Sequence, residues 1–222
     1  MTVRVVRKFN GVGFAALLDH PIFTESIRRI QQMVGPTGLT PIQEDVLFRL
    51  IHSSGDPGLA PLLRFSAGAC EAGMAALADG AVILTDTAMA AAAVAPMAAR
   101  TFGNAVHSVL EWAPAVAPVG QTRAALGMAY ALDHHPKATV LIGSAPTALE
   151  LLLEQVAAGA QSPALVIGMP VGFVGVAESK RHLAASGLAQ IRLEGSRGGA
   201  GLVAAAANAL LRRGWLDQVS VK

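Results

Sequence analysis

The stretch RLIHSSGD, residues 49–56, places one histidine, His52, between an apolar run and a small polar turn. An imidazole titrates near neutral pH, so a histidine that is held in position can donate or accept a proton during a reaction. The same residue could instead be a packing residue that closes a helix. A helix C-terminus favours the protonated imidazole, so we expect His52 to carry a proton readily if it lies there. His52 is a candidate proton donor, with a structural role as the alternative.

An arginine lies within a glycine-rich segment, GSRGG at 195–199. Glycines let backbone amides approach an anion, but glycine turns after strands also form because helix and strand pack closely there. The segment lacks the lysine and the spacing of a Walker motif, which disfavours a phosphate loop. A planar guanidinium offers a pair of donors to a carboxylate. Arg197 is therefore a candidate carboxylate clamp.

Two further polar clusters each have a structural interpretation beside a catalytic or metal-binding one. AESK, residues 177–180, opens a helix, and adjacent helical residues do not face each other, which excludes a Ser–Lys nucleophilic pair. Glu178 and Ser179 instead suit a helix start. In DHH, residues 133–135, adjacent histidines before a proline are badly placed for chelation, and no partner at helical spacing completes a set. With a single cysteine, Cys70, the sequence predicts no metal site and no intrachain disulfide.

Alternating strand and helix patterns must position these residues. Four β-prone runs are almost continuously apolar, as parallel strands covered on both faces are. They span 81–86, 139–143, 163–169 and 189–195. Helical segments follow at 87–100, 121–135, 145–159, 177–187 and 200–213. This alternation predicts an α/β fold, a three-layer α/β/α arrangement with a mainly parallel sheet in a single domain.

The N-terminal third is predicted to be helical, over 22–34, 40–52 and 66–79. TPIQ, residues 40–43, is a capping signature, because Thr40 can cap, a proline suits the first helical position and Gln43 can reach back to the cap. This register brings His52 to the C-terminal end of the second helix.

Ligand sites in open α/β sheets lie beyond the carboxyl ends of the strands. The informative residues fall there, because Asp86 ends the first predicted strand and a polar or glycine-containing segment follows each of the others. These segments are GSAPTA at 143–148, PVGFVGVAESK at 170–180 and GSRGGAG at 195–201. We expect them to meet at one edge of the sheet.

Composition narrows the class of protein. The chain has 222 residues, 53% of them apolar and 14% charged, which suffices for a substantial core and suggests that much of its surface lies against another subunit. The formal net charge is only +2, and no Lys/Arg cluster interleaved with aromatics stands out, which disfavours nucleic-acid binding. The N-terminus lacks the pattern of a secretion signal, and residues 87–99 are too short and proline-interrupted to cross a membrane. We expect a cytoplasmic protein without a membrane partner.

Four motifs together resemble one family. LIHSSGD, IGSAPTALELL, PALVIGMPVGFVGVAESK and RGGAGLVAAAANALL have the order and spacing expected of the precorrin-8X methylmutase family, also called precorrin isomerase. The likeness runs from about residue 20 to residue 213. It implies a single domain of this type over 1–222, with an N-terminal extension at 1–20 and a C-terminal tail at 214–222.

The resemblance implies an isomerase that moves a methyl group from C-11 to C-12 of precorrin-8X, or of cobalt-precorrin-8, in cobalamin biosynthesis. The product would be hydrogenobyrinate or the cobyrinate equivalent, and no added cofactor is implied. The resemblance assigns the proton to His52 and implies a homodimer. The substrate carries several carboxylates, which accounts for arginines in a mostly apolar site. The candidate substrate-binding residues are Arg123, Asp86, Met89, Ser144, Arg64, Pro170, Gly172, Phe173, Lys180, Arg197 and Gly198.

The chain departs from the family pattern at several polar positions. Residues 87–95 contain alanines where the family usually has a glycine and a hydroxyl residue, Ser144 replaces an asparagine and Ala200 replaces a serine. A second hypothesis is therefore a diverged homologue that binds a tetrapyrrole as a carrier or regulator without isomerising it. Retention of His52 favours the enzyme, whereas the altered 87–95 stretch favours the carrier.

Overall fold

The centre of the sheet consists of four parallel strands. In a computed structural model, which describes residues 19–220, they are β2 (Ile83–Thr85), β4 (Thr139–Ile142), β5 (Leu165–Gly168) and β6 (Gln190–Leu193). Their residues are almost all buried, because helices cover both faces of the sheet. These strands confirm the four apolar runs in the sequence.

Two short strands at the edges complete the sheet and are absent from the sequence prediction. β1 (Leu63–Phe65) pairs antiparallel with β6, and β3 (Val106–Ser108) pairs parallel with β2, which gives the order β1-β6-β5-β4-β2-β3. Each is three residues long and mixes polar with apolar side chains, so neither produces an apolar run. β1 is important for the site because it holds the chain that follows His52 against β6.

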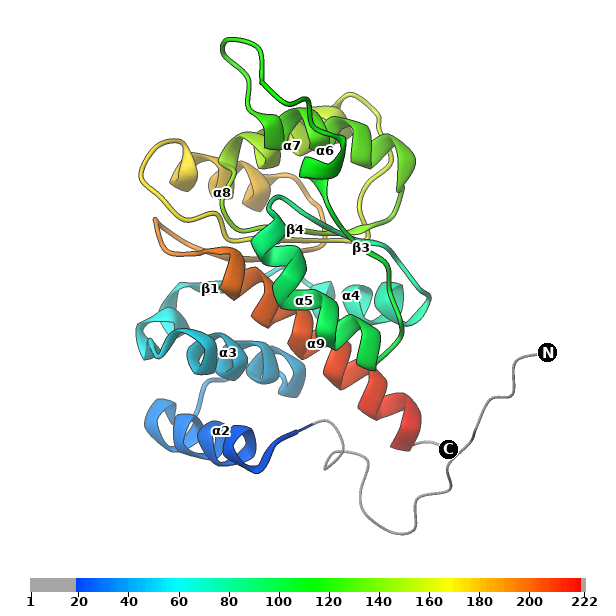
Figure 1. Cartoon of the computed structure of the whole chain (residues 1–222). Coiled ribbons are helices and arrows are strands. Elements are labelled where there is room, and N and C mark those ends of the chain that lie inside the picture. Colours follow the sequence, from blue (N-terminus) through cyan, green and yellow to red (C-terminus); the bar gives the residue numbers. More distant parts are fainter. Residues whose placement is uncertain (1–18, 221–222) are drawn as a thin grey trace, which may run out of the picture.

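Helices cover both faces of the sheet, and one face carries more layers of helices than the other (Figure 1). One face carries α6 (Arg123–His134), α7 (Pro146–Ala157) and α8 (Val176–Ala185). The other carries α4 (Ala69–Ala78), α5 (Ala88–Arg100) and α9 (Ala200–Ser220). Beyond that face, α3 (Pro41–Ser54) packs on α9 and α2 (Pro21–Val34) packs on α3. The α/β/α class with a mainly parallel sheet is confirmed, and α2 and α3 add a further layer.

The alanine-rich helix α9 is the element against which α3, α4 and α5 all pack. Its small buried side chains let these neighbouring helices approach closely. The helix continues to Ser220, past residue 213, where we expected it to end, so 214–220 of the expected tail are helical. Gly214 does not break it and packs beside Phe102. Residues 1–18 of the expected N-terminal extension lie outside the described residues.

Helix α3 begins at the capping signature read from the sequence. The Gln43 side-chain oxygen accepts a hydrogen bond from the Thr40 amide at 3.1 Å, and a proline occupies the first turn. Buried side chains such as Val46 and Leu50 fix the helix in the core. The helix ends at Gly55, which has a φ of 68° and supplies the left-handed conformation that this type of helix end requires. His52 therefore lies in the last turn, as predicted.

Among residues 19–220, none of the helices is both long enough and apolar enough to cross a membrane.

Candidate functional site at the carboxyl edge of the sheet

Asp86, directly after β2, fastens the loop that follows β4. One of its carboxylate oxygens, Oδ2, accepts hydrogen bonds from the amides of Gly143 at 3.1 Å, Ser144 at 2.6 Å and Ala145 at 2.8 Å. The side chain is fully buried, and its other oxygen has no hydrogen-bond partner among the described residues. Burial raises the pKa of Asp86, against the opposing effect of these amide hydrogen bonds. Asp86 thus sets the path of the loop at 143–145.

Backbone hydrogen bonds join the loops after β4, β5 and β6 into one rim. The Val171 amide donates to the Gly143 carbonyl at 3.1 Å, and the Gly172 amide donates to the Ser196 carbonyl at 3.1 Å. At Gly198, a Cβ would lie 1.9 Å from the Met169 carbonyl oxygen, so only glycine fits this contact. The structure therefore brings the segments GSAPTA, PVGF and GSRGG together, as expected at this edge.

Lys180, on α8, holds the backbone of the glycine-rich segment of this rim. Its side chain is 2% exposed, and its ammonium donates to the carbonyls of Gly195 at 2.8 Å and Arg197 at 2.6 Å. Burial lowers the pKa of Lys180 to about 8. These contacts fix the backbone of the glycine-rich segment, and with it the position from which the Arg197 side chain extends.

Arg197 connects the rim to the turn that follows His52. Its Nη1 lies 3.0 Å from the carboxylate of Asp56, which precedes the short helix η1 (Pro57–Leu62). Arg64, on β1, has Nη2 2.8 Å from the Glu194 carboxylate, and its Nη1 donates to the Pro61 carbonyl at 2.8 Å. Both arginines are partly exposed, so each combines a protein partner with access from outside.

Arg123 lies at the same edge, at the start of α6. Its Nε donates to the Pro114 carbonyl at 2.8 Å, and the guanidinium belongs to an exposed residue. The preceding Thr122 caps α6 and lies 2.7 Å, oxygen to oxygen, from Thr147 in the first turn of α7. This contact ties the beginnings of the two helices together, so Arg123 has a fixed position beside the loop at 143–145.

Large apolar side chains protrude from the rim. Phe173 is 95% exposed and Val174 88% exposed, while Pro170 beside them is buried. Met89, in the first turn of α5 after Asp86, is 68% exposed. Apolar side chains this exposed at a strand-end rim form a surface suited to the face of a large, flat, mostly apolar ligand.

His52 contacts α2 through Ser26 and Phe23. Its Nδ1 lies 2.7 Å from the hydroxyl oxygen of Ser26, and the Phe23 ring meets the imidazole edge-on, with 5.1 Å between ring centroids. Partial burial, and secondly the charge of Arg49, lower the pKa of His52. Both effects oppose the protonated imidazole that a helix C-terminus favours.

Ser26 is a contact of His52 that sequence reasoning missed. It lies on a different helix, and nothing in its own segment distinguishes it from an ordinary helical serine. The sequence does carry a signal for the electrostatic environment of His52, because Arg49 lies three residues earlier and on the same face of α3 as the histidine. Within residues 19–220, no group of three or more His, Cys, Asp or Glu side chains is gathered as a metal site requires.

Comparison with known proteins gives one family throughout. The model of the Precorrin-8X methylmutase family matches residues 21–213. A protein named cobalt-precorrin-8 methylmutase from Synechocystis sp. is 37% identical over 214 residues, covering 90% of this chain and 98% of that protein. A protein named precorrin-8X methylmutase from Pseudomonas aeruginosa is 42% identical over 193 residues, covering 85% and 93%.

Solved structures agree with the sequence comparisons. A structure of precorrin-8X methylmutase from Thermus thermophilus has a TM-score of 0.80 to this chain at 41% identity, and the match covers 89% of this chain and 96% of that one. A structure described as a precorrin-8X methylmutase related protein has a TM-score of 0.73 at 29% identity, covering 85% and 100%. The chain therefore belongs to the precorrin-8X methylmutase family of isomerases.

Proposed function

We propose that this protein moves a methyl group from C-11 to C-12 of precorrin-8X or cobalt-precorrin-8, giving hydrogenobyrinate or the cobyrinate equivalent, with His52 as the proton donor. Two curated relatives carry the names of these two substrates. A shift of this kind is pericyclic in character, so the protein must hold the ring in position and supply a proton where electrons relocalise.

The observation that carries the proposal is the contact between Ser26 and His52. The 2.7 Å hydrogen bond occupies Nδ1 and leaves Nε2 to address a ligand. A histidine held through one nitrogen, with the other free, has the arrangement that a general acid needs. The exposed apolar rim and its arginines supply, in the same proposal, the surface that binds the ring and its carboxylates.

Arg123, Arg197 and Arg64 are the proposed carboxylate ligands of this surface, and Asp86, Ser144, Pro170, Gly172, Lys180 and Gly198 shape it, beside Met89 and Phe173. Arg123 is the most readily tested, because its protein partner is only a carbonyl. Arg123→Ala should weaken binding of hydrogenobyrinic acid by about 1.5–3 kcal/mol, as for a hydrogen bond to a charged group. Unchanged affinity in an absorbance titration would remove Arg123 from the site.

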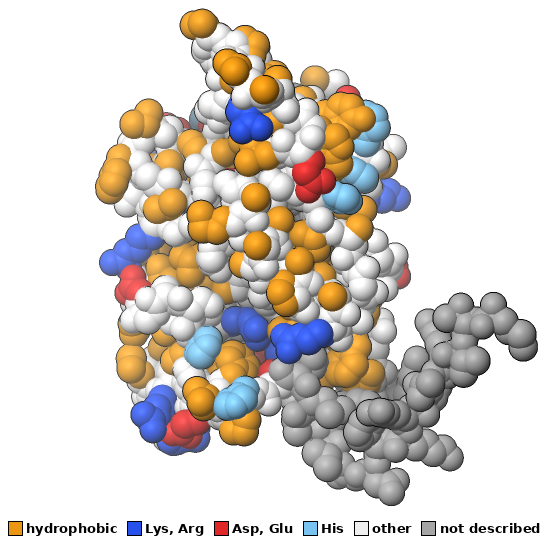
Figure 2. Space-filling model, in the orientation of Figure 1, with side chains coloured by type: hydrophobic (Ala, Val, Ile, Leu, Met, Phe, Trp, Pro, Cys, Tyr) orange, Lys and Arg blue, Asp and Glu red, His pale blue; other side chains and the backbone are white. Residues whose placement is uncertain are grey.

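A homodimer is the second part of the proposal, and α5 is its proposed contact surface. Apart from Arg100 in its last turn, the outward residues of α5 are small or apolar, including Ala92, Ala93 and Pro96. Figure 2 shows that this face of the molecule carries hydrophobic and backbone surface over α5, with few charged side chains. Small exposed side chains let two helices approach closely. We also propose a cytoplasmic location, consistent with a biosynthetic enzyme.

Incubation with precorrin-8X and with cobalt-precorrin-8, followed by absorbance spectroscopy, tests the activity. Methyl migration changes the conjugated system, so turnover should change the spectrum, whereas simple binding should give a stoichiometric shift that stops at one equivalent. The second outcome would support a tetrapyrrole carrier, the alternative favoured by the alanines at 92, 93, 95 and 200. Comparison of the two substrates would also show whether cobalt is required.

A further inference from the structure

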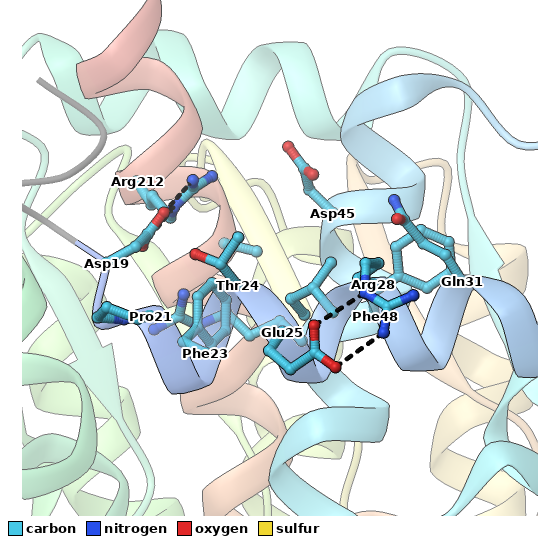
Figure 3. A pocket seen from close by; sticks show the side chains of 13 residues that line it. Asp19, Pro21, Phe23, Thr24, Glu25, Arg28, Gln31, Asp45, Phe48 and Arg212 are labelled. Carbon is cyan, nitrogen blue, oxygen red and sulfur yellow. Dashed lines mark hydrogen bonds and ion pairs between the residues drawn. The ribbon is translucent and has the colours of Figure 1, made fainter. Parts of the chain in front are cut away.

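A cavity of about 830 Å³ lies between α2, α3 and α9 (Figure 3). Apolar side chains form much of its wall, among them Phe23, Ile27 and Phe48. Charged side chains of both signs also line it, and Figure 3 shows them arriving from all three helices. The balance among these charges determines what the cavity can bind.

The carboxylates that line the cavity are each held by an arginine other than Arg49. The pairs are Asp19 with Arg212, Asp45 with Arg213, and Glu25 with Arg28. Each pair is within hydrogen-bond distance, and Glu25 also binds Arg29. These carboxylates are therefore not hydrogen-bonded to the remaining guanidinium.

Arg49 is the cation left without a hydrogen-bonded counterion. Its guanidinium carbon lies 4.8 Å above the Phe23 ring, and no described residue accepts a hydrogen bond from it. Burial, followed by the neighbouring charge of Arg212, lowers the pKa of Arg49 to about 10. A half-buried guanidinium of this kind has N–H donors without an acceptor. A planar anion such as a carboxylate can accept hydrogen bonds from two of them at once.

Arg49 and His52 belong to one surface. They lie three residues apart on α3 and therefore on the same side of the helix. Phe23 joins them, because its ring contacts the imidazole edge-on at 5.1 Å and carries the guanidinium on its face. A ligand that lies against His52 on this side of α3 therefore has Arg49 beside the same Phe23 ring.

We propose that Arg49 binds a carboxylate on one of the ligand's peripheral acid side chains while the ring lies against His52. This subsite rests on the proposed function and adds to it a specific anchor in the α2–α3–α9 cavity, separate from the arginines of the rim. The chemistry recognised is a carboxylate attached by a short flexible arm to a large apolar ring. Arg49 would fix the rotation of that ring relative to the proton donor.

The test is a binding cycle that varies both the protein and the ligand charge. Hydrogenobyrinic acid and its fully methyl-esterified form are titrated into the wild type, Arg49→Gln and Arg49→Met. Loss of Arg49 should weaken binding of the acid about 10- to 100-fold and leave binding of the ester within about threefold. Arg29→Gln is the matched control, because Arg29 is exposed, pairs with Glu25 and does not line the cavity. It should bind both ligands like the wild type.

Equal losses for acid and ester, or no loss for either, would overturn the Arg49 subsite. The melting temperature of each variant is measured beside its titration. If Arg49→Gln does not fold, the test uses Arg49→Met, because its apolar side chain suits the buried site. If the wild type turns over precorrin-8X but the Arg49 variants lose no affinity specific to the acid, only the Arg49 subsite is contradicted. If the Arg49 variants do lose affinity for the acid but the wild type shows no turnover, only the proposed reaction is contradicted. If the wild type binds neither ligand, both are contradicted.

Discussion

In the proposed reaction the two ring nitrogens of His52 have different tasks. With the ring protonated, Nδ1–H can donate to the Ser26 oxygen, and after Nε2 has given its proton to the ligand, the remaining Nδ1–H can keep the same hydrogen bond. Ser26 can therefore hold the ring in one orientation before and after the proposed proton transfer. Phe23 packs against the imidazole in a T-shaped contact. A serine on the neighbouring helix would thus give the histidine the fixed position that proton transfer requires.

His52→Ala should remove the proton donor without removing the binding surface. The variant should fold and bind the macrocycle, because the rim and the cavity remain, while turnover falls by about 10²–10⁴, the usual contribution of a positioned acid. The measurements are melting temperature, ligand affinity and turnover on the same protein. His182→Ala is the control, since His182 is an exposed histidine paired with Glu150. A stably folded His52→Ala protein with full turnover would end the proton-donor assignment.

The imidazole of His52 should titrate below its ordinary pKa of 6.5 in the free protein. Arg49→Gln should move that pKa upward, because it removes the neighbouring positive charge and leaves only Ser26 and Phe23 in contact with the ring. With a depressed pKa, the unfolded chain binds more protons, so His52 lowers native stability as the pH falls below 6.5. NMR titration of the ring protons checks the direction, and a pKa at or above 6.5 in the wild type would contradict it.

At the scale of elements, buried polar groups hold loops that glycine would otherwise leave loose. Asp86 binds three consecutive amides after β4, and Lys180 binds two carbonyls after β6. Both side chains come from a neighbouring element, so each loop is positioned by the sheet and its covering helix. The shape of the proposed binding surface therefore depends on these two sets of contacts.

Lys180 gives this bracing a pH signature. Its pKa in the folded protein is about 8, below the ordinary value of 10.5, so the native state releases the proton earlier than the unfolded chain. The free energy of unfolding should therefore rise between about pH 8 and pH 10.5, with a slope of up to about 1.4 kcal/mol per pH unit. Denaturant unfolding at several pH values measures the slope, and Lys180→Met should flatten it. An equal slope in that variant would assign the effect to another group.

The sequence predicts the central strands well because each is buried on both faces and therefore reads as one apolar run. It cannot predict β1 and β3, which are defined by pairing with distant segments rather than by their own composition. The same limit applies to the site. Strand ends locate the rim, whereas the contact of Ser26 with His52 and the lack of a hydrogen-bonded partner for Arg49 depend on how α2 packs on α3.

At the scale of the whole molecule, the sparsely charged face over α5 should determine the oligomeric state. Sedimentation at micromolar concentration should give a dimer, and Ala92→Arg should give a folded monomer, because a buried guanidinium without a partner opposes association. Ala184→Arg, at an exposed alanine of α8, is the control and should remain dimeric. A wild-type monomer, or an Ala92→Arg dimer of unchanged stability, would place the contact elsewhere.

The central position of α9 has a consequence for the order in which the core can form during synthesis. Among the described elements α9 comes late in the chain, yet α3, α4 and α5 all pack against it. Until α9 has been synthesised, these earlier helices lack the surface that covers their apolar faces, and β1 cannot complete its pairing before the chain has reached 191–193. The layer that carries His52 therefore depends on contacts of high sequence separation, and we expect it to be completed only after the segment that forms α9 is available.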